Sequence, residues 1–331
     1  MSAPALDPQI VTYLRRLEEA GLPPVEEQVP DEARASYNES APLVFGPVDE
    51  VYSVEDRDAG GVPVRIYRPV ETSEPSRALV YFHGGGWVLG NIETHDGVSR
   101  ALAKRTPCIV VSVDYRLAPE HPYPAALEDS WQAASWVLAN AKELGIDEER
   151  VGVGGDSVGG CLAAIVARRG RDHGTPFAAQ LLIYPTTTTR QETPSYSYFA
   201  LGYGLSREAM AWYWKQYLGD YDGSNDPDVS PAALHDMRRL PRAIVITAEA
   251  DVLRDEAETY AQRLFLSGVE TEGYQYEGMI HGFVRMAGIV DRSRQALDEI
   301  AESLGPFLDK GWREDFTVLL QQPAQEAPAE S

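Results

Sequence analysis

The most constraining feature of this sequence is a short apolar run that ends in glycines and passes directly into a helical pattern around one serine. Residues 151–160 are VGVGGDSVGG, and residues 161–167 are CLAAIVA. Glycine is needed on both sides of Ser157 because side chains there would collide across a sharp strand-to-helix turn. Such a turn places the Ser157 hydroxyl at a helix N-terminus, where backbone N–H groups and the helix dipole favour developing negative charge.

Glycine-rich turns of this kind also occur in dinucleotide-binding loops. Here Gly152-x-Gly154-x-x-Ser157 has serine where the last glycine of that fingerprint should stand, so we set this interpretation aside. Gly155-x-Ser157-x-Gly159 fits instead a nucleophile elbow, in which a strand delivers a serine hydroxyl to the top of a sheet.

Ser157 needs partners, and candidates follow it in a defined order. A serine hydroxyl becomes a nucleophile at neutral pH only beside a base that a third group holds in the right tautomer. Asp251 directly follows the apolar run 243–248, and His281 follows a further strand pattern. The order Ser, Asp, His is that of the α/β-hydrolase fold, so we predict His281 as the base and Asp251 as its orienting acid. Asp255 competes for the acid role, but we expect it to open the next helix.

A second glycine-rich stretch, HGGGW at residues 83–87, follows the apolar run 78–82. The N–H groups of Gly84, Gly85 and Gly86 are unobstructed by side chains, so we predict that they form an oxyanion hole, with Gly85 and Gly86 the preferred donors. The N–H of Val158, next to the nucleophile, is the third predicted donor. We expect His83 to order this loop through hydrogen bonds.

The pattern of the whole chain predicts the fold class. Continuous apolar runs are typical of strands buried on both faces of a parallel sheet, and helical stretches alternate with them. We therefore predict an α/β-hydrolase fold, with a mostly parallel central sheet flanked by helices and covered by a helical cap. The expected strands are 51–54 paired antiparallel with 62–67, 78–82, 108–113, 151–154, 179–184, 243–248 and 273–277; the expected helices are 94–104, 125–144, 158–169, 255–267 and 291–308.

The remaining segments define the expected domain organisation. Two helical patterns before the first strand predict an N-terminal helical cap segment at 1–45, and an aromatic-rich stretch without strand signals predicts a cap insertion at 186–231. The catalytic domain comprises 46–185 and 232–312, and the polar tail 321–331 is expected to be disordered. Ser206 should cap a helix at 206–218. The expected substrate-pocket residues are Trp87, Tyr198, Phe199 and Trp212.

Composition excludes several classes of protein. A formal net charge of −22 argues against nucleic acid and anionic membrane surfaces as partners. No apolar run approaches the ~20 residues that span a bilayer, so we expect no stable membrane insertion. No secretory leader is visible, which predicts a cytoplasmic protein.

The six histidines lack metal-ligand spacing, so we predict no metal and no cofactor. Cys108 and Cys161 lie in apolar runs and are expected to be buried thiols.

Five motifs together resemble the hormone-sensitive lipase family (family IV) of bacterial carboxylesterases. They are HGGGW at 83–87, DYRLAPEH at 114–121, GDSVGG at 155–160, DVLRDE at 251–256 and IHGF at 280–283, within a resemblance that runs from about 62 to 308. Two departures are small: Val158 stands where the family usually has alanine, and Val252 where it usually has proline.

The resemblance implies serine-dependent hydrolysis of short- to medium-chain acyl esters through an acyl-enzyme, without a cofactor. It also implies soluble enzymes that are often homodimers paired through an edge strand. Residues 114–121 would form a structural turn that pins the oxyanion loop, with Tyr115 and Arg116 able to touch it. Asp156 is expected to be structural. Val158 and aromatic cap residues should crowd the pocket and favour short acyl chains.

Two other functions share this scaffold. Receptors that resemble these enzymes bind a ligand under the cap without hydrolysing it, but they lack the catalytic histidine, which is present here as His281. An amidase or formamidase would use the same three residues, and the sequence does not separate it from an esterase.

Overall fold

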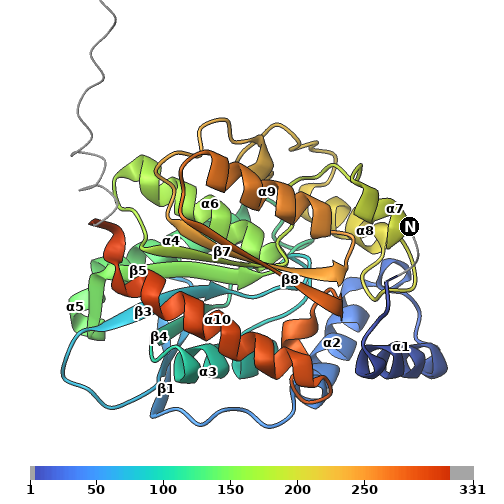
Figure 1. Cartoon of the computed structure of the whole chain (residues 1–331), viewed down its shortest axis with the longest axis horizontal. Helices are drawn as coiled ribbons and strands as arrows, with labels where there is room; N and C mark the ends of the chain where they lie inside the picture. The colour runs from blue at the N-terminus through green and yellow to red at the C-terminus, as the bar shows by residue number, and fades with distance from the viewer. Residues whose placement is uncertain (1–3, 314–331) are drawn as a thin grey trace, which may run out of the picture.

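Eight strands form a single sheet in the order β1-β2-β4-β3-β5-β6-β7-β8 (Figure 1). The structure is a computed structural model and describes residues 4–313, so the predicted tail 321–331 lies outside the described residues. The strands are β1 Ser53–Asp58, β2 Pro63–Arg68, β3 Ser76–Phe82, β4 Ile109–Val113, β5 Ile146–Asp156, β6 Ala179–Ile183, β7 Arg242–Ala250 and β8 Thr271–Ile280.

The sheet is parallel from β4 to β8 and antiparallel at β1 and β2. Strands β4 and β6 are buried at every residue, as continuous apolar runs predict for strands covered on both faces. The predicted antiparallel pair is present as β1 and β2, although β1 runs over 53–58 and not 51–54. The two strands are joined by a turn in which Asp58 accepts a hydrogen bond from the N–H of Gly61 at 2.7 Å. All six central strands therefore point their carboxyl ends to one edge, where the site lies.

Helices cover both faces of the sheet. In Figure 1, α4, α6 and α9 lie on one face and α3 and α10 on the other, which makes three layers. Their bounds are α3 Asp96–Arg105, α4 Ala125–Ala139, α5 Ala141–Leu144, α6 Val158–His173, α9 Arg254–Leu266 and α10 Asp291–Asp309, with the 3₁₀ turns η2 Glu93–His95 and η4 Phe283–Arg285.

One helix differs from its prediction. The expected helix 125–144 is interrupted at Asn140, which separates α4 from α5. The side-chain amide of Asn140 donates to the carbonyl of Trp136 at 2.8 Å. Asparagine competes with the backbone for such hydrogen bonds, and this accounts for the break.

Additional helices lie at the carboxyl edge of the sheet. From the N-terminal segment come α1 Pro8–Ala20, η1 Val25–Glu27 and α2 Pro30–Phe45; from residues 186–231 come α7 Pro194–Tyr198 and α8 Arg207–Leu218, followed by η3 Pro231–Ala233. Ser206 caps α8 as predicted, because its hydroxyl accepts a hydrogen bond from the N–H of Ala209 at 2.9 Å. In Figure 1, α1, α2, α7 and α8 gather at one end of the molecule.

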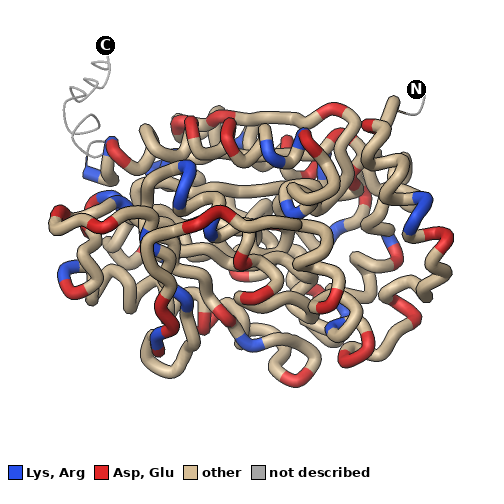
Figure 2. Tube along the Cα trace, turned by 90° about the horizontal axis from the view of Figure 1, so that it is seen from below, with Lys and Arg blue, Asp and Glu red and all other residues tan. Residues whose placement is uncertain are grey.

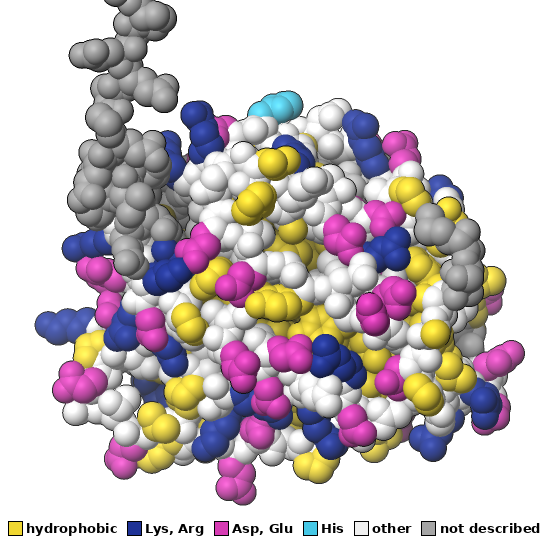
Figure 3. All heavy atoms as spheres, in the orientation of Figure 1, with side chains coloured by type: hydrophobic (Ala, Val, Ile, Leu, Met, Phe, Trp, Pro, Cys, Tyr) yellow, Lys and Arg dark blue, Asp and Glu magenta, His cyan; other side chains and the backbone are white. Residues whose placement is uncertain are grey.

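The surface reflects the acidic composition. Figure 2 shows Asp and Glu residues spread along the whole trace, with Lys and Arg between them. Strand β8 ends the sheet on the face shown in Figure 3, where hydrophobic side chains gather near the middle among charged ones. Among residues 4–313, no helix is both long and apolar enough to cross a membrane.

Candidate active site

The turn between β5 and α6 holds Ser157 in a conformation that few residues adopt. Its φ and ψ are 58° and −121°, and α6 begins at the next residue. A Cβ on Gly155 or Gly159 would collide with the carbonyl oxygen of Phe82 in the neighbouring strand. The two glycines therefore allow the chain to turn sharply, and strain of this kind persists only where the surroundings enforce it.

Three side chains from distant parts of the sequence meet at this turn. The Nε2 atom of His281 lies 2.9 Å from the Oγ of Ser157, and its Nδ1 atom lies 2.7 Å from the Oδ2 of Asp251. Asp251 follows β7 and His281 follows β8, so both come from the carboxyl ends of parallel strands. The arrangement has the geometry in which a base can accept a proton from a hydroxyl while a carboxylate orients that base.

The two aspartates that competed for the acid position have different partners. The second oxygen of Asp251 accepts a hydrogen bond from the N–H of Leu253 at 2.9 Å, and the residue is 1% exposed. Asp255 lies in the first turn of α9, as predicted, and accepts a hydrogen bond from the N–H of Ser195 at 2.8 Å. Of the two, only Asp251 is bonded to His281.

The loop after β3 brings glycine backbone to the cavity that Ser157 also lines, but not all the N–H groups that the sequence indicated are available there. Gly85 and Gly86 line the same cavity as Ser157, and no hydrogen bond within residues 4–313 uses their N–H groups. Val158 is the first residue of α6, so its N–H has no partner within the helix. The structure corrects the prediction for Gly84, because its N–H donates to the Oδ1 of Asp156 at 3.0 Å.

Asp156 anchors the glycine-rich loop 83–87 to the turn that carries Ser157. This buried carboxylate also accepts a hydrogen bond from the hydroxyl of Tyr81 at 2.8 Å and lies 3.4 Å from the Nε2 of His95. Burial alone raises its pKa, but the interactions with His95, the positive charge of Arg285 and the hydrogen bond from Tyr81 outweigh burial and hold the pKa of Asp156 below its usual range. Asp156, which precedes Ser157, therefore has structural contacts, as expected, and it fixes the loop through Gly84.

His83 and Tyr115 support the loop from its other side. The Tyr115 hydroxyl donates to the carbonyl of His83 at 2.6 Å, and their rings stack at 4.2 Å. Burial lowers the pKa of His83 to about 3, so its ring is neutral and can donate through Nδ1 to the carbonyl of Gly84 at 2.8 Å. Arg116 does not touch the loop; it forms an ion pair with Asp129 at 2.7 Å.

A cavity of about 450 Å³ opens over Ser157 and His281. None of the four predicted pocket residues is among those that line it. Trp87 is 1% exposed and stacks on the ring of Tyr217 at 4.4 Å, whereas Tyr198 is 52% exposed and faces outward. Phe199 packs against Tyr203, and Trp212 packs edge-on against Tyr213. These predictions fail because aromatic content alone does not tell which way a side chain of the cap, or of the loop after β3, points.

The residues that line the cavity come largely from the N-terminal helices and from the end of η4. Gly85, Gly86, Asp156, Ser157 and His281 in this lining were expected from the sequence, whereas the side chains from the N-terminal helices and Arg285 were not. Those relevant below are Tyr13, Ser36, Tyr37, Met210, Tyr213 and Arg285. The spacing of Tyr13 and Tyr37 from Ser157 along the chain gives no sign of this contact; the only available hint was that helices preceding the sheet form a lid.

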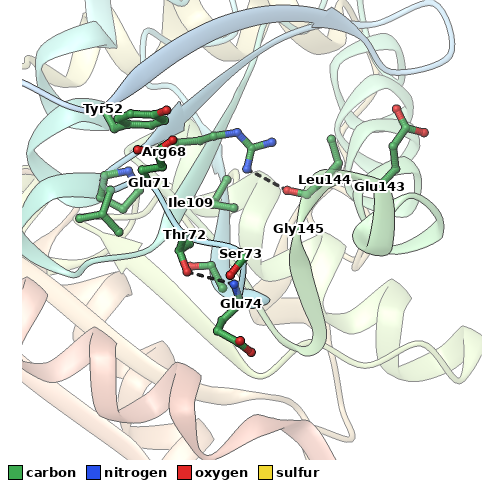
Figure 4. Close-up of a pocket in the computed structure, with 13 residues that line it drawn as sticks. Tyr52, Arg68, Glu71, Thr72, Ser73, Glu74, Ile109, Glu143, Leu144 and Gly145 are labelled. Carbon is green, nitrogen blue, oxygen red and sulfur yellow. Dashed lines mark hydrogen bonds between the residues drawn. The ribbon is translucent and has the colours of Figure 1, made fainter.

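A second hollow lies at the opposite end of the strands, between the end of β2 and α5 (Figure 4). Arg68 lines it and donates to the carbonyl of Leu144 at 2.8 Å, while the side chains of Glu71, Glu74 and Glu143 surround it. It contains no nucleophile paired with a base. Among the described residues, no group of three or more His, Cys, Asp or Glu side chains could hold a metal ion.

The fold and the site define the class: a serine on a sharp strand-to-helix turn, hydrogen-bonded to a histidine that is bonded to an aspartate, both from the ends of the following strands, in a three-layer α/β protein. A family model described as the alpha/beta hydrolase fold matches residues 79–285. The chain belongs to this family, and its resemblance to the hormone-sensitive lipase group is confirmed.

Named relatives support the same grouping. The chain is 42% identical over 245 residues to esterase LipI of Mycobacterium tuberculosis, which covers 73% of this chain and 77% of the relative. It is 35% identical to the ethyl acetate hydrolase of Pseudomonas putida, over 92% of this chain and 100% of that enzyme. Among solved structures, an ester hydrolase from the metagenome of Lake Arreo, bound to a bipyridine phosphonate derivative, superposes with a TM-score of 0.89 at 38% identity, over 92% of this chain and 99% of that one.

Proposed function

We propose that this protein is a serine carboxylesterase that hydrolyses short- to medium-chain acyl esters through an acyl-enzyme on Ser157. The observation that carries the proposal is the continuous chain of hydrogen bonds from Ser157 through His281 to Asp251, beside the free N–H groups of Gly85 and Gly86. The relatives named as esterases place the chain among ester hydrolases. The roles of individual residues are our assignment.

In the first half of the reaction, the Oγ of Ser157 attacks the ester carbonyl carbon. His281 Nε2 accepts the hydroxyl proton, and Asp251 stabilises the imidazolium that forms. The carbonyl oxygen becomes an oxyanion, which receives hydrogen bonds from the N–H groups of Gly85, Gly86 and Val158. The intermediate collapses when the bond to the alcohol oxygen breaks and His281 returns its proton to the leaving alcohol.

In the second half, water takes the place of the alcohol. His281 accepts a proton from this water as its oxygen attacks the acyl carbon, and the same oxyanion hole binds the second intermediate. The bond to Ser157 Oγ breaks, the serine regains its proton from His281, and the carboxylic acid leaves. The cycle consumes one ester and one water and needs no other group.

The preference for short and medium acyl chains rests on the dimensions of the cavity. The aromatic rings of Tyr13, Tyr37 and Tyr213 line its roughly 450 Å³ and leave limited room for a long chain. A function limited to ligand binding has less support, because Ser157 and His281 are both present and bonded to each other.

A homodimer paired through β8 forms a further part of the proposal. Strand β8 ends the sheet, and the nearby side chains Phe265, Leu266 and Tyr274 are 66%, 74% and 38% exposed. An unpaired strand edge flanked by apolar side chains suits pairing with a second copy.

The test is hydrolysis of p-nitrophenyl acetate, butyrate, octanoate and palmitate by the wild type and by Ser157→Ala. We expect the wild type to hydrolyse the acetate, butyrate and octanoate esters faster than the palmitate ester. The variant should lose activity by a factor on the order of 10⁶. Ser99→Ala is the control, because Ser99 is buried in α3 away from the cavity. Activity that survives in Ser157→Ala contradicts the proposed nucleophile, and a maximum at palmitate contradicts the proposed chain length.

A further inference from the structure

The cavity over Ser157 contains one unusual charge. Of the residues that line it, only Arg285 carries a permanent positive charge and only Asp156 a structural carboxylate. Arg285 ends η4, four positions after His281 in the sequence, and it is partly exposed to the cavity. An arginine beside Ser157 and His281, away from bulk water, needs a physical reason, because removing a cation from water is costly unless it is paired.

Arg285 has no carboxylate partner in the part of the chain that the structure describes. Its guanidinium lies over the ring of Tyr37 at 4.3 Å and donates through one terminal nitrogen to the hydroxyl of the same tyrosine. Its Nε is buried and has no hydrogen-bond partner within residues 4–313. Arg34, by comparison, forms an ion pair with Glu120 at 2.6 Å, and Arg105 one with Asp298 at 3.0 Å.

The one carboxylate among the residues that line the cavity already has other hydrogen-bond partners. Asp156 lines the same cavity, but its hydrogen bonds go to Tyr81, Gly84 and His95 and not to the guanidinium. Its charge still attracts Arg285 through space and helps to keep the guanidinium protonated. That attraction is not a hydrogen bond. The second terminal nitrogen of Arg285 therefore makes no hydrogen bond within residues 4–313 and is the donor that a ligand in the cavity could use.

The groups beside Arg285 are also donors. Burial raises the pKa of Tyr37 to about 12 and raises that of Tyr13, so both hydroxyls remain protonated at neutral pH. The hydroxyl of Tyr37 accepts from Arg285 and keeps its own proton to donate. Ser36 lines the same wall. A wall of one cation and several hydroxyl donors is complementary to an anionic acceptor with two oxygens.

We propose that the substrate of this enzyme is an ester that carries a free carboxylate, and that Arg285, assisted by the hydroxyl of Tyr37, binds this carboxylate. The inference rests on the proposed ester hydrolysis and adds the substrate class. Arg285 is thereby a specificity-determining residue of the cavity. A protein with a net charge of −22 does not attract anions at long range. A preference for a charged ester over a neutral one therefore has to come from a local cation.

The simplest other role of Arg285 is to clamp α2 onto the body through Tyr37. A clamp would affect charged and neutral esters equally, whereas a carboxylate-binding residue changes the ratio of their kcat/KM values. The experiment therefore compares matched pairs of esters that differ only in charge. Three acids are each paired with the amide of the same shape: monoethyl succinate and monoethyl adipate, which carry the carboxylate on the acyl side, and 4-acetoxybutanoate, which carries it on the alcohol side.

For the wild type we expect at least one acid to exceed its amide in kcat/KM at pH 7. In Arg285→Met that ratio should fall about 10- to 100-fold, because a hydrogen bond to a charged group contributes about 1.5–3 kcal/mol. Arg285→Lys should restore part of it. Arg292→Met is the matched control, since Arg292 also lies over a tyrosine ring but not in the cavity, and it should leave the ratio unchanged.

Ratios that are equal in the wild type and in Arg285→Met for all three pairs overturn the proposal. If Arg285→Met does not fold, competition on the wild type decides: glutaramate should inhibit p-nitrophenyl butyrate hydrolysis at lower concentration than neutral glutaramide, and equal inhibition overturns the proposal. If wild-type protein hydrolyses neither the nitrophenyl esters nor any of the six probes, the esterase function itself fails, which is a different result from an esterase without charge preference.

Discussion

Two sides of the same active site are built in different ways. On the side of the body, the elbow and the oxyanion loop are held by backbone geometry and buried hydrogen bonds, such as those of Asp156 with Gly84 and Tyr81. On the side of the cap, the cavity wall consists of side chains on α1, α2 and α8, and these helices are tied down by a few polar contacts such as those of Arg34.

This difference separates chemistry from specificity. The body tolerates almost no substitution at the turn around Ser157, because a Cβ at Gly155 or Gly159 would already collide with Phe82. The cavity wall can exchange Tyr37 on α2, or Arg285 at the end of η4 facing it, without disturbing the hydrogen bonds between Ser157, His281 and Asp251. Substitutions in the body should therefore reduce turnover for every ester, and substitutions in the cap should change affinity and substrate choice.

The largest expected effect is on the body side, at the acid. Asp251→Asn should lower kcat about 10⁴-fold, because an amide next to His281 Nδ1 favours the wrong tautomer of the imidazole. Asp255→Asn is the matched control, one turn further on; Asp255 bonds to Ser195 and Arg254 and should have a far smaller effect on kcat. Circular dichroism checks that both variants fold. Equal losses of kcat in the two variants would contradict our assignment of the acid.

The next effect lies where body and cap meet, at Glu256 on α9. This carboxyl is 3% exposed and accepts hydrogen bonds from the Thr187 N–H at 2.6 Å and the Thr186 hydroxyl at 2.9 Å, at the start of the cap insertion. Burial raises its pKa from 4.5 to about 8. Between these two pH values the native state keeps a proton that the unfolded chain has lost, so its contribution to stability is present below pH 4.5 and declines as the pH rises toward 8.

Glu256→Gln should remove this pH dependence, because glutamine resembles the protonated carboxyl and does not ionise. Relative to the variant, the wild type should lose about 1.4 kcal/mol of unfolding free energy per pH unit within that window. Urea unfolding at a series of pH values measures the difference, with the exposed Glu302→Gln as control. Parallel pH profiles for the wild type and Glu256→Gln would show that the buried carboxyl does not hold its proton.

The smallest effect is expected at the attachment of the cap. Arg34 on α2 donates to the carbonyls of Val88 and Ala118, each at 2.8 Å, and so joins the N-terminal helices to the oxyanion loop. Arg34→Met should lower the free energy of unfolding by about 1–3 kcal/mol and raise KM more than it lowers kcat. Arg238→Met, at an exposed pair with Asp236, should change stability by less than about 0.5 kcal/mol. A loss confined to kcat would mean that the cap acts on the chemistry directly.

Most of the body could be predicted from the sequence because its requirements are local. Continuous apolar runs gave the buried parallel strands, and the Gly-x-Ser-x-Gly pattern located the turn between β5 and α6. The antiparallel pair β1 and β2 also follows from its turn residues. The break at Asn140 was missed, since asparagine is tolerated inside helices unless its side chain finds a nearby carbonyl.

The sequence by itself determined the elbow, the choice of Ser157, Asp251 and His281, and their order, because each follows a strand pattern that carries it to the same edge of a parallel sheet. Only the tertiary structure decided that the N–H of Gly84 donates to Asp156. It also decided that the cavity is lined by Tyr13, Tyr37 and Arg285 and not by Trp87, Tyr198, Phe199 and Trp212. These contacts join segments far apart in the chain through packing of one helix face against the body. Residue type and local spacing do not encode which face that is.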